Sequence, residues 1–283
     1  MATAVIDGIT TRYEVIGSGP AVLMFSPGGF DATLDKWTTQ SIYSRIRPVD
    51  HLSRKYRCII FDRREAGQSG GRVECISWAH YVKQGKGLLE YLQIERAHIM
   101  GACMGVCPAV AFGVAHPEAT VSLLLYWPVG GAKYRIRCHA RFAEHLAYVK
   151  QHDLEGVVGL VKKEGKSFGQ DARGGPWATV VGRDPSFADS YVNQDVHRYT
   201  HLVNEMVRGL FDRDTAPGAE PEELSRVDIP ALIVPGNDES HATSAARYLN
   251  EYLPRAQYWD VAVEGQTAQT APPRMMHFLD TAC

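Results

Sequence analysis

Neither sign of charge is in clear excess in this sequence. The 30 Lys and Arg residues and the 32 Asp and Glu residues give a formal net charge of −2. Proteins that bind nucleic acid or an anionic membrane surface usually carry a basic surplus, so we expect neither as a partner. Cysteine is also scarce, with six residues in a chain of 283, which suits reduced thiols in the cytoplasm better than a disulfide scaffold. We expect no secretory signal, because the first residues lack a basic segment followed by a long apolar run.

Long hydrophobic runs are missing as well. The uncharged stretch Ile99–Ala115 falls short of the ~20 residues that usually span a bilayer, and three glycines and a proline interrupt it. Metal-binding patterns of the C-x-x-C or H-E-x-x-H type are absent, and the two thiols of Cys103 and Cys107 are too few to hold zinc. The sequence therefore predicts no membrane span, no metal and no cofactor.

Short apolar runs alternate with helical stretches in the first half of the chain. Such runs are typical of strands buried on both faces of a sheet, and helices between them indicate a parallel, doubly wound sheet. Amphipathic helices then fill residues 131–227 before strand-like runs return. We predict an α/β protein with a mostly parallel sheet formed by residues 1–130 and 228–283, and a helical cap formed by residues 131–227. The strand-like runs are Ala21–Phe25, Cys58–Phe61, Ala97–Gly101, Val121–Trp127, Ala231–Val234 and Gln257–Val263.

A strand, a tight turn and a helix are expected around Cys103. A nucleophile on a sharp turn of this kind needs small residues two positions before and after it, because neighbouring backbone passes close by. Gly101 and Gly105 supply them. The helix N-terminus that follows lowers the pKa of a thiol at this position. Cys103 is therefore the candidate nucleophile, the alternative being a buried structural cysteine.

Five segments resemble motifs of the α/β-hydrolase fold superfamily, in the family's order and over nearly the whole chain. The cysteine at the nucleophile elbow, in place of the usual serine, is similar to that of dienelactone hydrolases. The resemblance implies the α/β-hydrolase fold and covalent catalysis through Cys103. The segments are Ser26-Pro27-Gly28-Gly29-Phe30 (oxyanion loop), Asp62-Arg63-Arg64 with Gly67-Gln68-Ser69 (the D-x-R-G-x-G-x-S turn, with Glu65 where glycine is usual), Gly101–Gly105 (nucleophile elbow), His116-Pro117-Glu118 (end of the elbow helix) and Pro230–Gly236 followed by Asp238 (acid loop).

The catalytic histidine that the resemblance implies after the last strand is absent, and Gln266 stands in its place. His241 on the predicted acid loop is the nearer substitute, because loops at the carboxyl ends of parallel strands build the site; the alternative is a surface or capping residue. His277, in the predicted last helix, is a second candidate. We assign Asp238 as the acid, with Glu239 as the alternative. If His241 does not reach the attacking water, Gln266 can orient that water but cannot take its proton, so an acyl-enzyme should accumulate and Gln266→His should speed its hydrolysis.

Backbone donors for an oxyanion and aromatic residues for a pocket complete the expected site. By resemblance, the two donors are the N–H groups of Gly29 and Met104. Trp37, Trp127 and Trp177 fall on the oxyanion loop, the strand end before the cap and the cap itself. We expect these tryptophans to line a substrate pocket between the two parts of the molecule, with core packing as the alternative.

The sequence predicts a cytoplasmic hydrolase in which Cys103 attacks a small apolar or aromatic ester, lactone or activated ketone and forms an acyl-thioester. The basic segment Lys133–Arg141 is either a solvated face or attracts a substrate carboxylate. Two other classes stay open: a non-hydrolytic lyase, isomerase or C–C bond cleaving enzyme, which the missing histidine favours, and a small-molecule receptor without catalysis. The expected partner is a small-molecule substrate, and a homodimer is left open.

Overall fold

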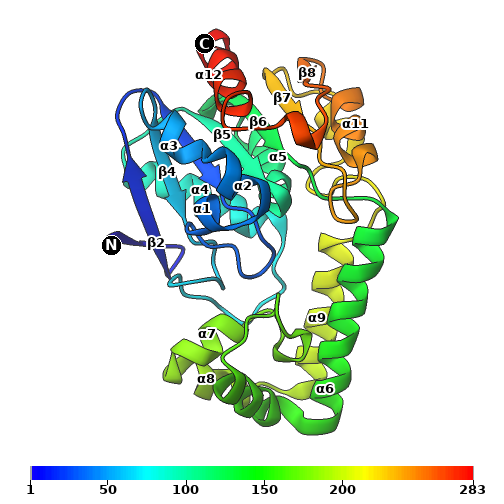
Figure 1. Cartoon of the computed structure of the whole chain (residues 1–283). Helices are drawn as coiled ribbons and strands as arrows, with labels where there is room; N and C mark the ends of the chain where they lie inside the picture. Colours follow the sequence, from blue (N-terminus) through cyan, green and yellow to red (C-terminus); the bar gives the residue numbers. More distant parts are fainter. Residues whose placement is uncertain (1, 283) are drawn as a thin grey trace.

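An eight-stranded sheet with strand order β1-β2-β4-β3-β5-β6-β7-β8 forms the centre of the molecule (Figure 1). The structure is a computed structural model and describes residues 2–282. The pairs β1–β2 and β2–β4 are antiparallel, and all pairs from β4 to β8 are parallel. The strands are β1 (Ala2–Ile6), β2 (Ile9–Ile16), β3 (Ala21–Phe25), β4 (Arg57–Phe61), β5 (Ala97–Ala102), β6 (Thr120–Tyr126), β7 (Ala231–Val234) and β8 (Ala256–Tyr258).

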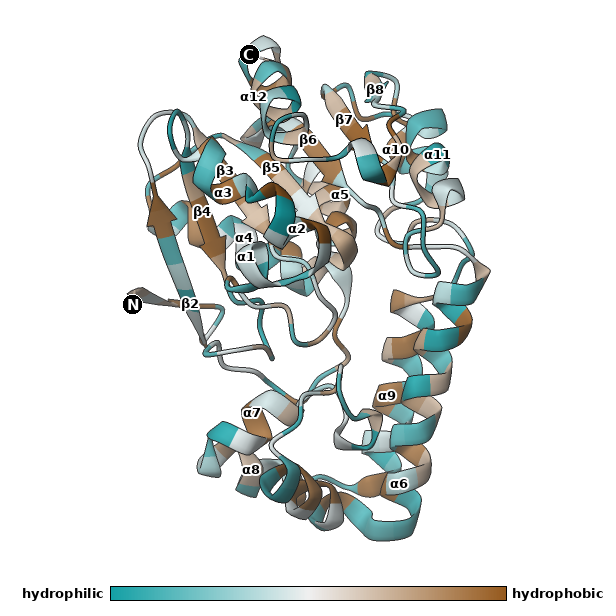
Figure 2. Ribbon diagram, in the orientation of Figure 1, coloured by the Kyte–Doolittle hydropathy of each residue, from teal (hydrophilic) through white to brown (hydrophobic). Residues whose placement is uncertain are grey.

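Helices cover both faces of the sheet, because successive side chains of each central strand point in opposite directions. One face packs on α1 (Lys36–Thr39), α2 (Ser41–Ile46), α3 (Pro48–Leu52) and α12 (Ala271–Thr281), and the other on α4 (Trp78–Tyr91), α5 (Val106–Ala115), α10 (Pro221–Leu224) and α11 (Thr243–Tyr252). In β3, Val22 and Met24 belong to the first layer, whereas Leu23 and Phe25 belong to the second. Hydrophobic residues accordingly concentrate in the strands (Figure 2). The sheet therefore has two apolar layers and holds the strand ends rigidly.

A helical insertion leaves the sheet between β6 and β7 and forms a separate layer (Figure 1). Its helices pack around an apolar cluster that includes Val157, Trp177 and Tyr199 and that continues onto Phe30 and Met104 of the sheet domain. The indole of Trp177 ties it to the sheet domain by donating to the carbonyl of Arg72 at 2.9 Å. These helices lie within the range 131–227 predicted from the sequence. They are α6 (Ala132–Glu164, interrupted by non-helical backbone at Asp153), α7 (Ala178–Arg183), α8 (Pro185–Val192) and α9 (Val196–Leu210), with a 3-10 turn η3 (Ala172–Gly174) between α6 and α7.

The last strand is shorter than the sequence predicted. β8 ends at Tyr258, since only Ala256–Tyr258 pair with β7, and Val263–Gly265 form the 3-10 turn η4. Two other 3-10 turns are η1 (Cys103–Gly105), directly after β5, and η2 (Pro117–Ala119), before β6. No helix within residues 2–282 is both long and apolar enough to cross a membrane.

Candidate active site

Cys103 lies at the sharp turn between β5 and α5. Its backbone φ is +54°, a left-handed conformation that a non-glycine residue adopts only where its surroundings enforce it. Gly101 and Gly105 are needed around it: a Cβ on Gly101 would collide with the carbonyl of Gly105, and a Cβ on Gly105 would collide with the carbonyl of Phe25 in β3. The two glycines therefore let β5, the turn and the neighbouring strand approach closely, and the Cys103 side chain projects from the apex, half-buried.

The loop after β7 supplies an imidazole–carboxylate pair. His241 Nδ1 lies 2.8 Å from Oδ1 and 2.9 Å from Oδ2 of Asp238. The same carboxylate accepts the backbone N–H groups of Ser240 at 2.8 Å and of His241 at 2.9 Å. The hydrogen bond from His241 is the main reason why the pKa of Asp238 lies well below its usual range. Asp238 therefore stays ionised and fixes the Nδ1–H tautomer of the imidazole, leaving Nε2 free on the other side.

His241 and Cys103 interact with each other across the end of the sheet. Burial by itself would raise the pKa of the Cys103 thiol, but the charge of the nearby His241 holds that pKa below the ordinary value. Burial likewise opposes protonation of His241, yet the Cys103 thiolate and Asp238 together raise its pKa to about 9. Nε2 of His241 is buried without a well-aligned hydrogen-bond partner, which is common for catalytic pairs before substrate binds. The arrangement favours a thiolate–imidazolium pair at neutral pH.

Backbone N–H groups converge on the sulfur of Cys103. Those of Gly28 and Met104 are hydrogen-bonded to it and stabilise the thiolate. Gly29, the donor expected from the resemblance, lines the same cavity, but the N–H directed at the sulfur belongs to its neighbour. Gly28 has a φ of +107°, which aims this peptide at the elbow. The resemblance assigned this donor to Gly29, and the structure corrects that assignment, because the N–H group that faces the sulfur is that of Gly28.

Arg63, which the sequence did not single out as a site residue, lies underneath this loop. Its Nη2 donates to the carbonyl of Gly29 at 2.6 Å and also to that of Gly28. The guanidinium is 1% exposed, packs on the ring of Tyr81 at 5.1 Å, and leaves Nε and Nη1 without partners. Arg63 therefore fixes two carbonyls of the loop whose N–H group faces the sulfur.

A cavity of about 440 Å³ opens over Cys103, between the sheet domain and α6. Its charged lining consists of Lys36, Asp31, Arg137 and Arg141. Lys36 and Asp31 neutralise each other at 2.8 Å, whereas both arginines bind uncharged oxygens, of Ser240 and Phe168. The cavity therefore has an excess of positive charge beside an apolar wall formed by Phe30, Met104, Tyr134, Phe142, Phe168 and Phe211.

The three tryptophans predicted to bind substrate do not line this cavity, and that prediction is wrong. Trp37, on α1, is fully buried in the core against Tyr43. Trp177 is fully buried in the core of the insertion. Trp127 is 6% exposed and packs on His241. Large aromatic side chains gain most from complete burial, and the phenylalanines listed above form the cavity wall in their place.

The remaining candidates lie away from the sulfur. His277 is exposed on α12. Glu239 is exposed and pairs with Lys133 at 3.2 Å. Cys107 is buried, and burial raises the pKa of its thiol far above the ordinary value. Within residues 2–282 no group of three or more His, Cys, Asp or Glu side chains could hold a metal ion.

Gln266 is fully buried, and protein groups occupy its whole amide. Its Oε1 accepts from the hydroxyl of Tyr126 and the indole of Trp127, both at 2.7 Å, and its Nε2 donates to the carbonyls of Pro235 at 2.9 Å and Val261 at 3.3 Å. Its 0% exposure corrects the expectation that this amide orients a water molecule at the thioester.

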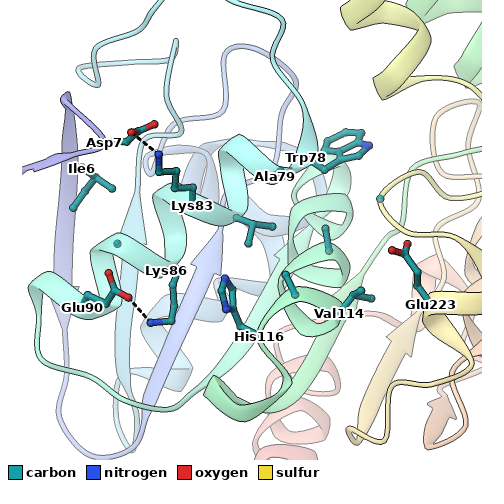
Figure 3. Close-up of a pocket in the computed structure, with 15 residues that line it drawn as sticks. Ile6, Asp7, Trp78, Ala79, Lys83, Lys86, Glu90, Val114, His116 and Glu223 are labelled. Carbon is teal, nitrogen blue, oxygen red and sulfur yellow. Dashed lines mark hydrogen bonds and ion pairs between the residues drawn. The ribbon is translucent and has the colours of Figure 1, made fainter.

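A second, larger cavity of about 610 Å³ lies over α4 and α5 (Figure 3). Its charged residues form pairs with one another, Lys83 with Asp7 and Lys86 with Glu90, each at 2.6 Å. It contains no cysteine to act with its single histidine, His116, whose carboxylate partner is the exposed Glu118 at 3.5 Å. The smaller cavity over Cys103 is therefore the candidate active site.

Comparisons with known proteins agree with this architecture. No family model matches the chain. It is 30% identical over 125 residues to the dihydrolipoyllysine-residue acetyltransferase component of the acetoin cleaving system of Cupriavidus necator, a match over 44% of this chain and only 31% of that relative. It is 23% identical over 249 residues, 82% of this chain and 72% of the relative, to the 2-hydroxy-6-oxo-6-(2'-aminophenyl)hexa-2,4-dienoic acid hydrolase of Metapseudomonas resinovorans.

A solved structure covers the chain from end to end. The enol-lactonase from Burkholderia xenovorans LB400 superposes with a TM-score of 0.62 at 18% identity, over 99% of this chain and 100% of that one. An α/β hydrolase from Sphaerobacter thermophilus also superposes, with a TM-score of 0.59 at 17% identity, over 98% of this chain and 100% of that one. The predicted fold class is confirmed: this chain has the α/β-hydrolase fold.

Proposed function

We propose that this protein is a hydrolase that cleaves a small ester, lactone or activated ketone through Cys103. The observation that carries the proposal is the strained Cys103 turn at the floor of a cavity, with the His241–Asp238 pair against its sulfur. A structural cysteine would not need a left-handed backbone or an imidazole held by a carboxylate. The dienoic acid hydrolase and the enol-lactonase among the similar proteins support the same reaction class.

Acylation begins with attack of the Cys103 thiolate on the substrate carbonyl carbon. The carbonyl electrons move to oxygen, and the N–H groups of Gly28 and Met104 stabilise the resulting oxyanion, with Gly29 beside them. When the oxyanion collapses, the leaving group departs with the proton of the His241 imidazolium. Asp238 keeps the imidazole in the tautomer that can deliver this proton.

Deacylation uses the same imidazole, now neutral. His241 takes a proton from water as the water oxygen attacks the thioester carbon, and the thiolate leaves as the tetrahedral intermediate collapses. The acid product is released, and the thiolate–imidazolium pair is restored. Because His241 comes from the loop after β7, hydrolysis does not need a histidine at position 266.

The residues that line the cavity favour a substrate with an apolar or aromatic body and a carboxylate group. Phenylalanine rings form one wall, and Arg137 and Arg141, one turn apart on α6, carry charges that no carboxylate within residues 2–282 balances. A half-buried guanidinium such as that of Arg141 gains most from a paired carboxylate, whereas Arg137 lines the same cavity but is exposed. We therefore place the substrate carboxylate against α6 and its reacting carbonyl at Cys103, with the insertion acting as a cap.

The test of the reaction is a chromogenic 4-nitrophenyl ester combined with intact mass measurement. We expect one acyl group on Cys103 in rapidly quenched samples, and oxygen-18 from labelled water in the acid product. Cys103→Ala should abolish both signals, whereas Cys138→Ser, which alters the second thiol that lines the cavity, should retain acylation. Product without oxygen-18 would indicate a lyase or isomerase, and binding without any acyl adduct would indicate a receptor.

The test of the substrate class compares two esters of matched length, mono-4-nitrophenyl succinate and 4-nitrophenyl butyrate. Arg141→Gln and Arg137→Gln should lower kcat/KM for the anionic ester about 10-fold to 100-fold more than for the neutral one, the range expected from loss of a charge-assisted hydrogen bond. Arg135→Gln is the matched control on the same helix, because Arg135 is paired with Asp214 at 3.1 Å and lies outside the cavity. Equal losses for both esters would contradict the carboxylate position.

A further inference from the structure

Gln266 forms a bridge between three segments that surround the candidate base. Its carbonyl oxygen receives hydrogen bonds from the end of β6, and its amide nitrogen gives hydrogen bonds to Pro235, just before the loop of His241, and to Val261. Two accepted and two donated hydrogen bonds are the full capacity of one carboxamide. A histidine, with at most one acceptor nitrogen, and a glutamate, with no donor when ionised, cannot reproduce this pattern.

Trp127 connects Gln266 to the imidazole. It follows β6 with a φ of +55°, an uncommon conformation for a large side chain, and its backbone N–H donates to the carbonyl of Val234 at 2.8 Å. Its indole N–H donates to Gln266, and its ring centroid lies 5.2 Å from that of His241, with a tilt of 53°. The indole therefore has one fixed orientation, with its ring beside the imidazole.

The backbone at Gly236 passes close to both of these side chains. A Cβ built on Gly236 would lie 2.6 Å from Cβ of His241 and 3.1 Å from the Trp127 ring, so the glycine leaves room for these two side chains and for nothing larger. His241 is thus held between Trp127, Gly236 and the carboxylate of Asp238.

We propose that Gln266 is a positioning residue for the base: by fixing the indole of Trp127, it keeps the imidazole of His241 in line between Asp238 and Cys103. The proposal rests on the proposed function in taking His241 as the base. In the α/β-hydrolase pattern the histidine itself occupies the position of Gln266. In this chain His241 on the neighbouring loop serves as the base, and Gln266 supports it through Trp127.

The indole also acts electrostatically. The face of a tryptophan ring attracts a cation within about 6 Å, so Trp127 favours the imidazolium form of His241 and, with it, the thiolate of Cys103. The titratable groups around the imidazole are Asp238 on its own loop and Cys103 on the elbow. Tyr43 of α2 interacts with both of these, and burial raises the pKa of its hydroxyl well above the ordinary value. Arg137 of α6 reaches the adjacent Ser240.

The experiment measures the rate at which iodoacetamide alkylates Cys103 between pH 5 and 10, in Gln266→Leu and in the full-length parent protein. We expect the midpoint of the pH profile to move upward, with alkylation at pH 7 falling about threefold to tenfold, the range of a lost cation–π contact. With the 4-nitrophenyl ester, kcat should fall by at least the same factor while KM stays within twofold.

A matched control separates positioning from general destabilisation. Gln84 of α4 is also a buried glutamine, whose amide makes three hydrogen bonds, to Arg64, Thr11 and Asp62. Gln84→Leu should lower the melting temperature without moving the alkylation midpoint. Trp127→Phe is the second variant, should Gln266→Leu not fold: it keeps a ring but removes the indole N–H, so it should show a smaller shift in the same direction.

These experiments test the positioning role of Gln266 independently of the proposed hydrolase function. If folded Gln266→Leu and Trp127→Phe both alkylate with the parent's pH profile, the positioning role is overturned, whatever the reaction. If the parent forms no acyl-enzyme but the Gln266→Leu midpoint still moves, the proposed function fails while the support of the Cys103–His241 pair by Gln266 stands.

Discussion

His241 and Asp238 lie three residues apart in one loop, and the Asp238 carboxylate binds both the Nδ1 atom and the backbone N–H of His241. The proposed base and acid are therefore positioned by a single short segment after β7. The loop is in turn anchored at Gly130, which pairs with His241 as an isolated bridge at the start of the insertion. A movement of the insertion would therefore shift the position of His241.

The first prediction concerns the reactivity of the thiols. Cys103 should react with iodoacetamide first, because its pKa is lowered, whereas burial raises the pKa of Cys138 to about 11 and that of Cys58 to about 12. Its alkylation rate should rise with pH to a midpoint below that of an ordinary thiol, because the pKa of Cys103 is lowered. Peptide mass mapping at limiting reagent is the measurement, and preferential labelling of any other cysteine at pH 7 would refute the prediction.

The second prediction concerns the base and the acid. His241→Ala should lower kcat for the 4-nitrophenyl ester by about 10²–10⁴, the usual contribution of general acid–base catalysis. Asp238→Asn should cause a large part of that loss by removing the charge that supports the imidazolium. Glu239→Gln is the matched control, because Glu239 is exposed and pairs only with Lys133. A loss below about threefold in His241→Ala would rule out this base.

The third prediction concerns the pH optimum of acylation. The reactive form has Cys103 deprotonated and His241 protonated, so the rate should rise as the thiol ionises and fall as His241 loses its proton. The upper limb should lie near pH 9, where His241 titrates. The pH profile of the burst rate measures it, and a burst that keeps rising past pH 10 would show that the imidazolium is not needed.

The fourth prediction concerns acid stability. His145 is buried in the insertion as a neutral imidazole, with Nδ1 2.8 Å from the carbonyl of Arg173 and Nε2 2.7 Å from the hydroxyl of Tyr199. Burial lowers its pKa to about 4, while the unfolded chain binds the proton near pH 6.5. The unfolded state therefore holds more protons between these values, and the free energy of unfolding should fall by on the order of 3 kcal/mol as pH drops from about 6.5 to 4.

Urea titrations at pH 7 and pH 5 check this acid sensitivity. His98, whose pKa burial also lowers to about 4, should add a slope of the same sign. His145→Gln should be less stable at pH 7 but should lose less stability between pH 7 and pH 5 than the parent. An unchanged difference between the two pH values would show that His145 does not carry the slope.

The fifth prediction concerns Arg63. Arg63→Met should lower kcat at least tenfold, because the carbonyls of Gly28 and Gly29 lose their common donor and the N–H group at the sulfur is no longer fixed. Loss of an oxyanion donor itself costs about 10²–10³ in kcat, which sets the upper range. Arg63→Lys should recover part of the rate, since it keeps one donor and the charge. Thermal melts identify any variant whose loss reflects unfolding.

The sixth prediction reverses an expectation from the sequence. Gln266→His, which restores the residue usual at this position of the fold, should lower the rate of both acylation and deacylation. An imidazole cannot bind Tyr126, Trp127, Pro235 and Val261 at once. Burst kinetics with the chromogenic ester measure both steps, and a faster slow phase in this variant would favour the original expectation.

The sequence by itself determined the fold class, the order of the strands along the chain and the place of Cys103. Short apolar runs such as Ala21–Phe25 are typical of strands covered on both faces, and Gly101 and Gly105 have a local geometric reason to flank a sharp turn. The helical content of residues 131–227 also follows from local periodicity. These features depend on residues close together in the sequence, so pattern alone can identify them.

Only the tertiary structure decided which groups meet at the sulfur. The sequence favoured His241 over His277 from its place on the acid loop, but it assigned the N–H donor to Gly29, because the choice between Gly28 and Gly29 depends on how separate loops converge at the end of the sheet. The tryptophans show the same limit: their positions in the sequence suggested a pocket, but complete burial of an indole ring outweighs exposure to a cavity. Gln266 was visible as a missing histidine, whereas its four hydrogen bonds to distant segments exist only in the folded chain.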